Sequence, residues 1–262
     1  MTTPVSAVVT GAGSGIGRAI AERLHADGWA VALVDRDQPA VQAVAAGLGD
    51  GAAWVSGDVT DRRTHQRAAE SAVALGPLAG WVNCAGVTRP CGLPQLTQGE
   101  AAATIDVNLY GTLWGTQAAV GHWLAAGTGG ALVNISSVHG RRAYPDHAVY
   151  EMTKAAIEAL TRNVGVSHAA DGIRANAVAP GGVRTPALEE SLASALDPAA
   201  AMAELTDFIP AGRLAEAAEV AAVVAFLLSD QAGYISGQTV VVDGAMTAHI
   251  GFRADAEAKR PT

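Results

Sequence analysis

The sequence has few charged residues, few aromatic residues and very little cysteine. Charged side chains make up 16% of its 262 residues and aromatic side chains 5%, whereas half of the chain is hydrophobic. This composition excludes a mainly disordered chain and predicts an interior built from Ala, Val, Leu and Ile. There is no block of Lys or Arg, and 25 acidic residues against 17 basic ones give a net charge of −8. Nucleic acids and anionic membranes are therefore not expected as partners, because both are bound mainly through clustered cations.

Features of export and of membrane insertion are also missing. No window approaches the 18 apolar residues of a spanning helix, and residues 1–4 have no basic region of the kind that opens a signal peptide. Only two cysteines occur, Cys84 and Cys91, and we expect both to be reduced thiols in a cytoplasmic protein. The histidines and cysteines have no partners at metal-ligand spacing, so no metal site is expected.

Short β-branched runs alternate with Ala-rich stretches of helical periodicity. The expected strands are residues 5–10, 30–34, 53–56, 80–83, 131–135, 174–178 and 239–242. The expected helices are residues 16–26, 39–46, 60–75, 98–124, 148–169 and 217–228. This alternation predicts an α/β fold: a single-domain, Rossmann-type, doubly wound seven-stranded parallel sheet with helices on both faces. One domain is expected over residues 1–262, with 181–214 as a lid over the substrate and 246–262 as a C-terminal tail.

A glycine-rich segment follows the first strand and opens directly into a helix. It has the pattern G-x-x-x-G-x-G on Gly11, Gly15 and Gly17, which matches neither G-x-G-x-x-G nor a Walker A loop. A strand, a tight turn and a helix N-terminus together direct backbone N–H groups and a helix dipole at an anion. An ordinary glycine-rich βα turn is the alternative, but the position after the first strand favours a dinucleotide site.

Two aspartates follow the second and third predicted strands. Asp35 stands eighteen residues after Gly17, where a carboxylate can accept hydrogen bonds from ribose hydroxyls and repel a 2′-phosphate. This predicts NAD rather than NADP, although the adjacent Arg36 could neutralise part of such a phosphate, and Asp35 could instead be a capping or loop residue. Asp58 could accept from an adenine amino group or could cap the helix that starts near Thr60.

Tyr150 and Lys154 are four residues apart and therefore share one face of a predicted helix. A free tyrosine side chain has a pKa near 10, so proton exchange at neutral pH needs a nearby cation to stabilise the phenolate. Lys154 supplies that charge. Such a pair also occurs by chance on many helices, so on its own it is a weak indication of catalysis.

The pair is one of several motifs that occur together in a fixed order. These motifs are Thr10-Gly-x-x-x-Gly-x-Gly17, Asp58, Asn83-Cys84-Ala85-Gly86, Asn108, Asn134-Ile135-Ser136-Ser137, Tyr150-x-x-x-Lys154 and the segment Pro180-Gly-Gly-Val-Arg-Thr-Pro186. In order and spacing the chain resembles the short-chain dehydrogenase/reductase family over nearly its whole length, to Gly244. Cys84 departs from the family pattern, which has a second Asn there, and this puts one structural hydrogen bond in doubt.

The resemblance implies a role for each matching residue. Tyr150 is the acid/base, Lys154 stabilises the phenolate and holds the nicotinamide ribose, Ser137 binds the substrate oxygen, and Asn108 supports a water relay to Lys154. Ser137 is preferred to Ser136 for its spacing from Tyr150. The implied cofactor-binding residues are Gly11, Ser14, Gly15, Ile16, Gly17, Asp35, Asp58, Val59, Asn83, Ala85, Gly86, Tyr150, Lys154, Pro180, Gly181, Val183 and Thr185. A homotetramer joined through the 98–124 and 148–169 helices and the last strand is implied as well.

The activity that the resemblance implies is hydride transfer between NAD(H) and a secondary alcohol or ketone. Three alternatives stay open: an NADPH-dependent 3-oxoacyl-thioester reductase, an isomerase or dehydratase of the same fold, and a non-catalytic dinucleotide-sensing protein. Turnover of NADH with ketones would distinguish an enzyme from a sensor.

Basic residues crowd between the catalytic Ser and Tyr. His139, Arg141, Arg142 and His147 fall there, and Arg89 and Arg184 are on other loops at the same sheet edge. Family members that act on short hydroxy acids are similar in having a histidine two residues after the serine. We therefore expect Ser137, His139, His147 and Tyr150 to bind a substrate with a polar or anionic group beside the reacting carbon. Solvated or ion-paired arginines are the alternative.

Overall fold

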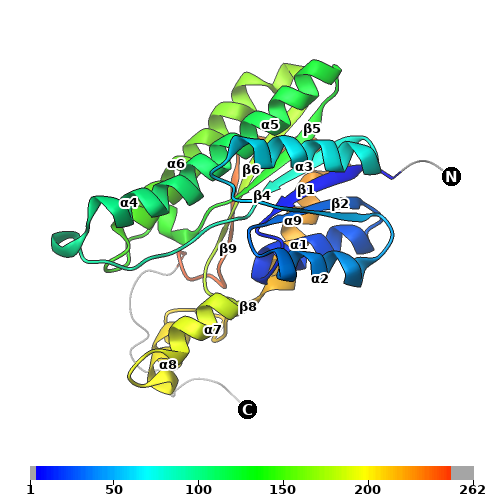
Figure 1. The fold of residues 1–262 in the computed structure, drawn as a ribbon. Coiled ribbons are helices and arrows are strands. Elements are labelled where there is room, and N and C mark those ends of the chain that lie inside the picture. Colours follow the sequence, from blue (N-terminus) through cyan, green and yellow to red (C-terminus); the bar gives the residue numbers. More distant parts are fainter. Residues whose placement is uncertain (1–3, 249–262) are drawn as a thin grey trace, which may run out of the picture.

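A seven-stranded parallel sheet runs through the centre of the protein in the computed structural model, which describes residues 4–248 (Figure 1). The strand order is β3-β2-β1-β4-β5-β6-β9. These strands are β1 (Ser6–Thr10), β2 (Ala30–Asp35), β3 (Ala52–Ser56), β4 (Leu78–Asn83), β5 (Gly130–Ile135), β6 (Ile173–Pro180) and β9 (Thr239–Val242). The predicted fold class is confirmed, and each of the seven predicted strands overlaps an observed one.

Helices cover both faces of the sheet (Figure 1). The face with α1, α2 and α9 is packed around one apolar cluster, and the face with α3, α5 and α6 around a second. The helices of the two layers are α1 (Gly15–Ala26), α2 (Gln38–Leu48), α3 (Arg62–Leu75), α4 (Gln98–Ile105), α5 (Gly111–Ala126), α6 (Ala148–Ser167) and α9 (Ala217–Leu228). None of the helices within residues 4–248 combines the length and the hydropathy needed to cross a membrane.

The strands are apolar at nearly every position because both faces of the sheet are covered. In β1, Ala7 and Val9 belong to the first cluster, whereas Val8, which points to the opposite face, belongs to the second. β2 alternates in the same way. Continuous apolar runs of this kind distinguish buried parallel strands from the half-polar strands of an exposed sheet.

The prediction of a single helix over residues 98–124 is wrong, because the segment forms two helices. Its observed counterpart is α4 followed by α5, joined by a π-helical turn at Asp106–Tyr110. A π-turn inserts one extra residue into the helix and often marks a functional site. The turn contains Asn108, one of the predicted site residues.

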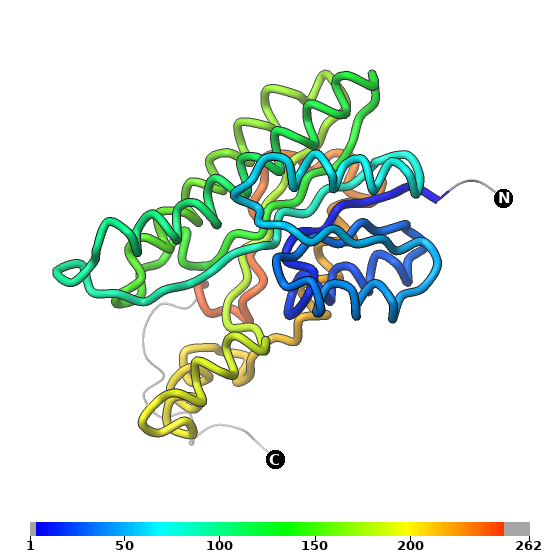
Figure 2. Tube along the Cα trace, viewed as in Figure 1, coloured from blue at the N-terminus to red at the C-terminus, as the bar shows by residue number. Residues whose placement is uncertain are grey.

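The 181–214 segment is more regular than the sequence suggested. It contains α7 (Pro186–Ala193) and α8 (Pro198–Asp207), which project from the body of the protein beside the end of β6 (Figure 2). Pro186 and Pro198 occupy the first turns of these helices, where no N–H partner is needed, so they start helices rather than break them. Two-residue strands, β7 (Val183–Arg184) and β8 (Ala215–Glu216), pair at its base and are too short to give a periodic pattern. Of the expected 246–262 tail, residues 249–262 lie outside the described residues.

Candidate active site

A cavity of about 880 Å³ opens at the carboxyl ends of the parallel strands. Loops that follow β1, β2, β4, β5 and β6 line it, and α6, α7 and α8 complete its walls. Because β2 and β5 lie on opposite sides of β1 and β4, the cavity extends from Asp35 at one end to Tyr150 at the other. A crevice at the point where the strand order reverses is the usual ligand site of an open α/β sheet.

The glycine loop lies at the centre of this cavity. Gly11 has φ +68°, and a Cβ atom there would stand 2.9 Å from the backbone of Ala85. A Cβ atom at Gly17 would overlap the carbonyl oxygen of Gly11. The N-cap residue of α1, Ser14, makes no side-chain cap, and the first turn contains no acidic residue. The N–H groups of this turn thus remain open to an anion.

Asp35 and Asp58 both line the cavity at its β2–β3 end. The Asp35 carboxylate accepts hydrogen bonds from the backbone N–H of Gly13 at 2.9 Å and of Asp37 at 3.0 Å, which fix its position beside the glycine loop. Asp58 accepts from the N–H of Thr60 but does not cap a helix, because α3 begins later and is capped by Asp61. The remaining lone pairs of both carboxylates are free for donors on a ligand.

Asn83 does not line the cavity, in contrast to its expected place among the cofactor residues. It is 3% exposed, accepts from Trp81 Nε1, and donates to the side chains of Thr116 and Asn134 and to the carbonyl of Thr112. Both N–H groups of this amide are used inside the protein, and its burial keeps it from a ligand. Its function is to fasten the end of β4 to α5 and β5.

Cys84 replaces the second Asn of the family pattern without leaving the turn unsupported. The hydroxyl of Thr10 accepts from the backbone N–H of both Cys84 and Ala85, at 3.0 and 3.1 Å. Burial raises the pKa of the Cys84 thiol to about 12, so the side chain stays neutral. Ala85 and Gly86 of the same turn line the cavity.

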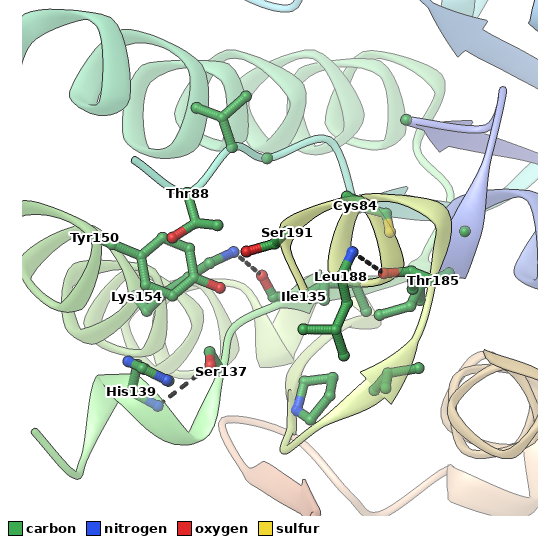
Figure 3. Close-up of a pocket in the computed structure, with 18 of the residues that line it drawn as sticks. Cys84, Thr88, Ile135, Ser137, His139, Tyr150, Lys154, Thr185, Leu188 and Ser191 are labelled. Carbon is green, nitrogen blue, oxygen red and sulfur yellow. Dashed lines mark hydrogen bonds between the residues drawn. The ribbon is translucent and has the colours of Figure 1, made fainter. Parts of the chain in front are cut away.

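Tyr150 and Lys154 project from the first turns of α6 into the cavity (Figure 3). The Lys154 Nζ atom lies 5.4 Å from the centroid of the Tyr150 ring and donates to the carbonyl of Ile135 at 2.9 Å. Lys154 is 4% exposed, so its charge is poorly screened by water. The arrangement places an ammonium beside the Tyr150 phenol.

The two adjacent serines after β5 have different surroundings. The Ser136 hydroxyl donates to the carbonyl of Lys154 and lies 3.3 Å from the carboxylate of Glu158, so it is occupied by the packing of β5 against α6. The Ser137 hydroxyl accepts from the N–H of His139 and faces the cavity beside Tyr150 (Figure 3). Its O–H donor is therefore free, which agrees with the choice of Ser137.

The Asn108 side chain holds the strand-to-helix loop above the cavity. Its Oδ1 accepts from the N–H of Val87 and its Nδ2 donates to the carbonyl of Val87, each at 2.8 Å, with a further contact to Thr153 Oγ1. This amide is fully buried, does not line the cavity, and uses both of its N–H groups inside the protein. The structure therefore gives the Asn108 side chain a role in holding the loop.

The other predicted cofactor residues gather around the same cavity. Its lining includes Gly11, Ser14, Gly15, Ile16, Gly17, Val59, Pro180, Gly181, Val183 and Thr185. Thr185 also caps α7 by accepting from the N–H of Leu188 (Figure 3). A Cβ atom on Gly15 would touch the Thr185 side chain, so the glycine loop and the loop after β6 meet across the cavity.

Aromatic and imidazole rings surround the phenol of Tyr150. The ring of His139 lies 5.6 Å from that of Tyr150, 5.2 Å from that of His147 and 5.9 Å from that of Tyr144, and all four residues line the cavity. Burial, and then the proximity of His147, lower the pKa of His139. His139 is therefore neutral at pH 7.

The expected basic cluster does not form at the cavity. Arg141 binds Glu158 at 2.9 Å, Arg184 pairs with Glu189 and Glu216, and Arg142 donates to backbone carbonyls. None of these three, nor Arg89, lines the cavity. Sequence position placed the arginines near the site, but carboxylates on α6, α7 and β8 hold Arg141 and Arg184 elsewhere. This corrects the expectation of an arginine-rich substrate pocket.

The lid contributes a mostly apolar wall that the sequence analysis did not predict. Leu188 and Leu192 of α7, and Leu205 and Phe208 at α8, line the cavity together with Met246, and the polar residues of α7 and α8 in the lining are Ser191 and Glu204. The spacing of 188 and 192 is that of one helix face, so this signal was present once the two lid helices were assigned. An apolar wall opposite Tyr150 suits a hydrocarbon skeleton better than a charged one.

Glu158 provides a first prediction, which concerns stability. Its side chain is 5% exposed and joins Arg141 and Ser136, thereby tying the Ser137 loop to α6. Glu158→Ala should lower the free energy of unfolding by about 1–3 kcal/mol, because it removes a charge-assisted hydrogen bond from Arg141 and a hydrogen bond from Ser136. Urea denaturation measures this loss, with the exposed Glu70→Ala in α3 as the control. An equal free energy of unfolding for the two variants would show that the contacts of Glu158 with Arg141 and Ser136 do not stabilise the protein.

Comparison with known proteins identifies the family. A family model described as "Enoyl-(Acyl carrier protein) reductase" matches residues 11–247. A solved structure described as a short chain dehydrogenase/reductase family protein superimposes with a TM-score of 0.82 at 32% identity, covering 93% of this chain and 98% of its own. The chain belongs to the short-chain dehydrogenase/reductase family.

Similar characterised proteins carry the names of dehydrogenases. A 3beta-hydroxysteroid dehydrogenase 1 of Eggerthella lenta is 36% identical, over 94% of this chain and 95% of that protein. A (3R)-3-hydroxyacyl-CoA dehydrogenase of Mus musculus is 38% identical (92% and 95%), and a cis-4-hydroxycyclohexanecarboxylate dehydrogenase of Sinomonas cyclohexanicum is 39% identical (92% and 96%). This short-chain dehydrogenase/reductase is thus an oxidoreductase, of a family that uses nicotinamide dinucleotides.

The residues of the cavity fit such a cofactor. The open N–H groups of α1 suit its pyrophosphate, and the backbone approaches so closely at Gly11 that a side chain there is excluded. Asp35 offers acceptors for ribose hydroxyls at one end, and Tyr150 and Ser137 stand at the other. The glycine loop, Asp35, Ser137 and Tyr150 all line one cavity.

Proposed function

We propose that this short-chain dehydrogenase/reductase interconverts a secondary alcohol and a ketone with NAD(H), and that Tyr150 is the acid/base. The observation that carries the proposal is the presence of Tyr150, Lys154 and Ser137 in the same cavity as the glycine loop and Asp35. A nicotinamide dinucleotide bound there would accept or supply the hydride.

The side chains account for the proton and for the orientation of the substrate. The Tyr150 phenolate takes the hydroxyl proton in oxidation, and the phenol returns it in reduction. The free O–H of Ser137 donates to the same substrate oxygen and orients it. Lys154, whose Nζ atom lies 5.4 Å from the centroid of the Tyr150 ring, stabilises the phenolate, and the apolar residues of the lid exclude water from the reacting carbon.

The proposal is tested by incubating the protein with NAD and a panel of secondary alcohols, among them alicyclic ones. Alicyclic alcohols are included because the lid wall is apolar and because one relative is named for a cyclohexane substrate. We expect reduced cofactor and ketone to appear in equal amounts. The absence of turnover with every alcohol and ketone tried, despite cofactor binding, would favour a dinucleotide-sensing protein.

The cofactor preference is a second prediction. Asp35 should make the kcat/KM for NAD at least about tenfold higher than that for NADP, because its carboxylate would face a 2′-phosphate. Asp35→Asn should narrow this ratio while keeping an acceptor for the N–H of Gly13. Arg36→Ala is the matched variant, and it should widen the ratio by removing a cation from the cavity wall.

Steady-state kinetics with both cofactors measure these ratios. Equal use of NADP by the wild-type enzyme would show that Arg36 outweighs Asp35. A preference for NADPH would instead favour the second candidate function, reduction of a 3-oxoacyl thioester. The observation in favour of that candidate is the relative named (3R)-3-hydroxyacyl-CoA dehydrogenase.

We also propose that four copies assemble through α4, α5 and α6 and through β9. Large apolar side chains are exposed on these helices and on the π-turn between α4 and α5, among them Tyr110, Leu124, Met152 and Val166. Association would remove them from water.

A further inference from the structure

Glu151 directly follows Tyr150 in α6 and faces the imidazole of His139. Its Oε1 atom accepts from the backbone N–H of Tyr144 at 2.6 Å and lies 3.6 Å from His139 Nδ1. Both side chains are about four-fifths buried, at 23% and 21% exposure. Glu151 does not line the cavity, so its carboxylate can affect a ligand there only through a residue that does, such as His139.

The two nitrogens of His139 have different surroundings. Nδ1 is buried and makes no hydrogen bond within the described residues, and the Glu151 carboxylate lies 3.6 Å from it. Nε2 is not buried, and the residue lines the cavity beside Tyr150. A carboxylate opposite Nδ1 favours the tautomer with the proton on Nδ1, which leaves a lone pair on Nε2.

A neutral imidazole in this tautomer accepts a hydrogen bond and cannot donate one from Nε2. No arginine of the loops around Tyr150 lines the cavity, and the residues of α7 and α8 that line it are mostly apolar, with Ser191 and Glu204 as the polar ones. The site therefore offers no arginine to a substrate carboxylate, whereas His139 offers an acceptor close to the acid/base.

We propose that Glu151 is a positioning residue which sets His139 as a hydrogen-bond acceptor, and that the substrate carries a second hydroxyl within one or two carbons of the reacting carbon. The proposal rests on the proposed alcohol dehydrogenase function. It replaces the anionic substrate expected from the sequence with a neutral diol.

Three ring alcohols separate the possibilities. The probes are cis-1,2-cyclohexanediol, which offers a second donor, 2-methoxycyclohexanol, which offers only an acceptor, and cis-2-hydroxycyclohexanecarboxylate, which is an anion. We expect the kcat/KM of the diol to exceed that of each of the others by at least about tenfold, because a buried acceptor discriminates against partners without a donor.

Variants at both residues test the geometry. His139→Phe should abolish the preference for the diol by removing the acceptor, and His139→Gln should restore part of it, since its amide oxygen can reach the position of Nε2. Glu151→Gln should keep the hydrogen bond to Tyr144 but lower the preference several-fold, mainly through KM, because the tautomer is no longer fixed. Glu70→Gln on α3 changes the same chemical group at an exposed position and should leave the preference unchanged.

The pH profile distinguishes this role from a purely structural one. The titratable groups that face His139 are Glu151 and Tyr150 of α6, and His147 and Tyr144 of the segment before it. When His139 gains a proton it becomes a donor, so the preference for the diol should fall, and that for the acid should rise, as the pH drops below about 6.5. In Glu151→Gln this change should move to lower pH.

The possible outcomes separate this proposal from the proposed function. If the methoxy alcohol and the diol are oxidised equally well, or if Glu151→Gln keeps the wild-type preference and pH profile, the enzyme remains an alcohol dehydrogenase and the role proposed for Glu151 and His139 is wrong. A higher kcat/KM for the acid at pH 8 would also overturn it. If no alcohol is oxidised at all, the proposed function fails and this inference fails with it.

Discussion

Replacing Tyr150 with phenylalanine is expected to lower kcat by at least about a hundredfold while the affinity for the cofactor changes little. The substitution removes the group that exchanges the substrate proton, and general acid–base catalysis typically contributes 10² to 10⁴-fold. The aromatic ring remains, so its contacts with His139 and His147 and the packing of α6 are preserved.

Single-turnover and steady-state rates with the best alcohol measure this effect, and titration of NADH fluorescence measures cofactor binding. Ser137→Ala is the matched comparison, because it removes a hydroxyl that orients the substrate but carries no proton in the reaction. Its loss should be smaller than that of Tyr150→Phe. If Tyr150→Phe keeps a third of the wild-type kcat, Tyr150 is not the acid/base of the reaction.

Replacing Lys154 with methionine is expected to lower kcat by about 10²- to 10³-fold and also to raise the KM for NAD. The substitution keeps the length of the side chain but removes an almost fully buried ammonium, which stands 5.4 Å from the Tyr150 ring centroid. The loss in kcat is expected because the Tyr150 phenolate loses the cation that stabilises it. The rise in KM is expected because the enzyme loses the hydrogen bond that Lys154 is proposed to make to the nicotinamide ribose.

A variant that keeps the charge is the decisive comparison for Lys154. Lys154→Arg should retain more activity than Lys154→Met, because the guanidinium still places a cation near the Tyr150 oxygen. Steady-state rates of the two variants measure this difference. Equal kcat values for Lys154→Met and the wild type would contradict an electrostatic role.

The sheet could be predicted from the sequence because strand burial leaves a direct pattern. Buried parallel strands give continuous β-branched runs, as in β1 and β2, and their boundaries are fixed by the glycines and polar residues at the turns. The lid helices could not be read in this way. Thr185 with Pro186, and Asp197 with Pro198, are strong helix starts, but prolines in a loop region resemble breaks until the caps are seen.

The cavity and its partners needed the three-dimensional arrangement. Motif order was enough to bring Ser137, Tyr150 and Lys154 to one place, because parallel strands end at the same edge of the sheet. Motif order could not show that the Asn83 amide is hydrogen-bonded inside the protein, or that Arg141 forms an ion pair with Glu158 instead of lining the substrate cavity. Such pairings join residues that are distant in sequence, so no local sequence pattern predicts them.

The most direct test of the account follows the hydrogen on the reacting carbon. A secondary alcohol deuterated at the carbinol carbon should be oxidised by the wild-type enzyme with NAD, and mass spectrometry of the two products should find one deuterium in the reduced nicotinamide for each ketone formed. Tyr150→Phe should show the same transfer at a rate lower by at least about a hundredfold. Loss of the deuterium to water, or ketone formed without labelled cofactor, would contradict hydride transfer in this cavity.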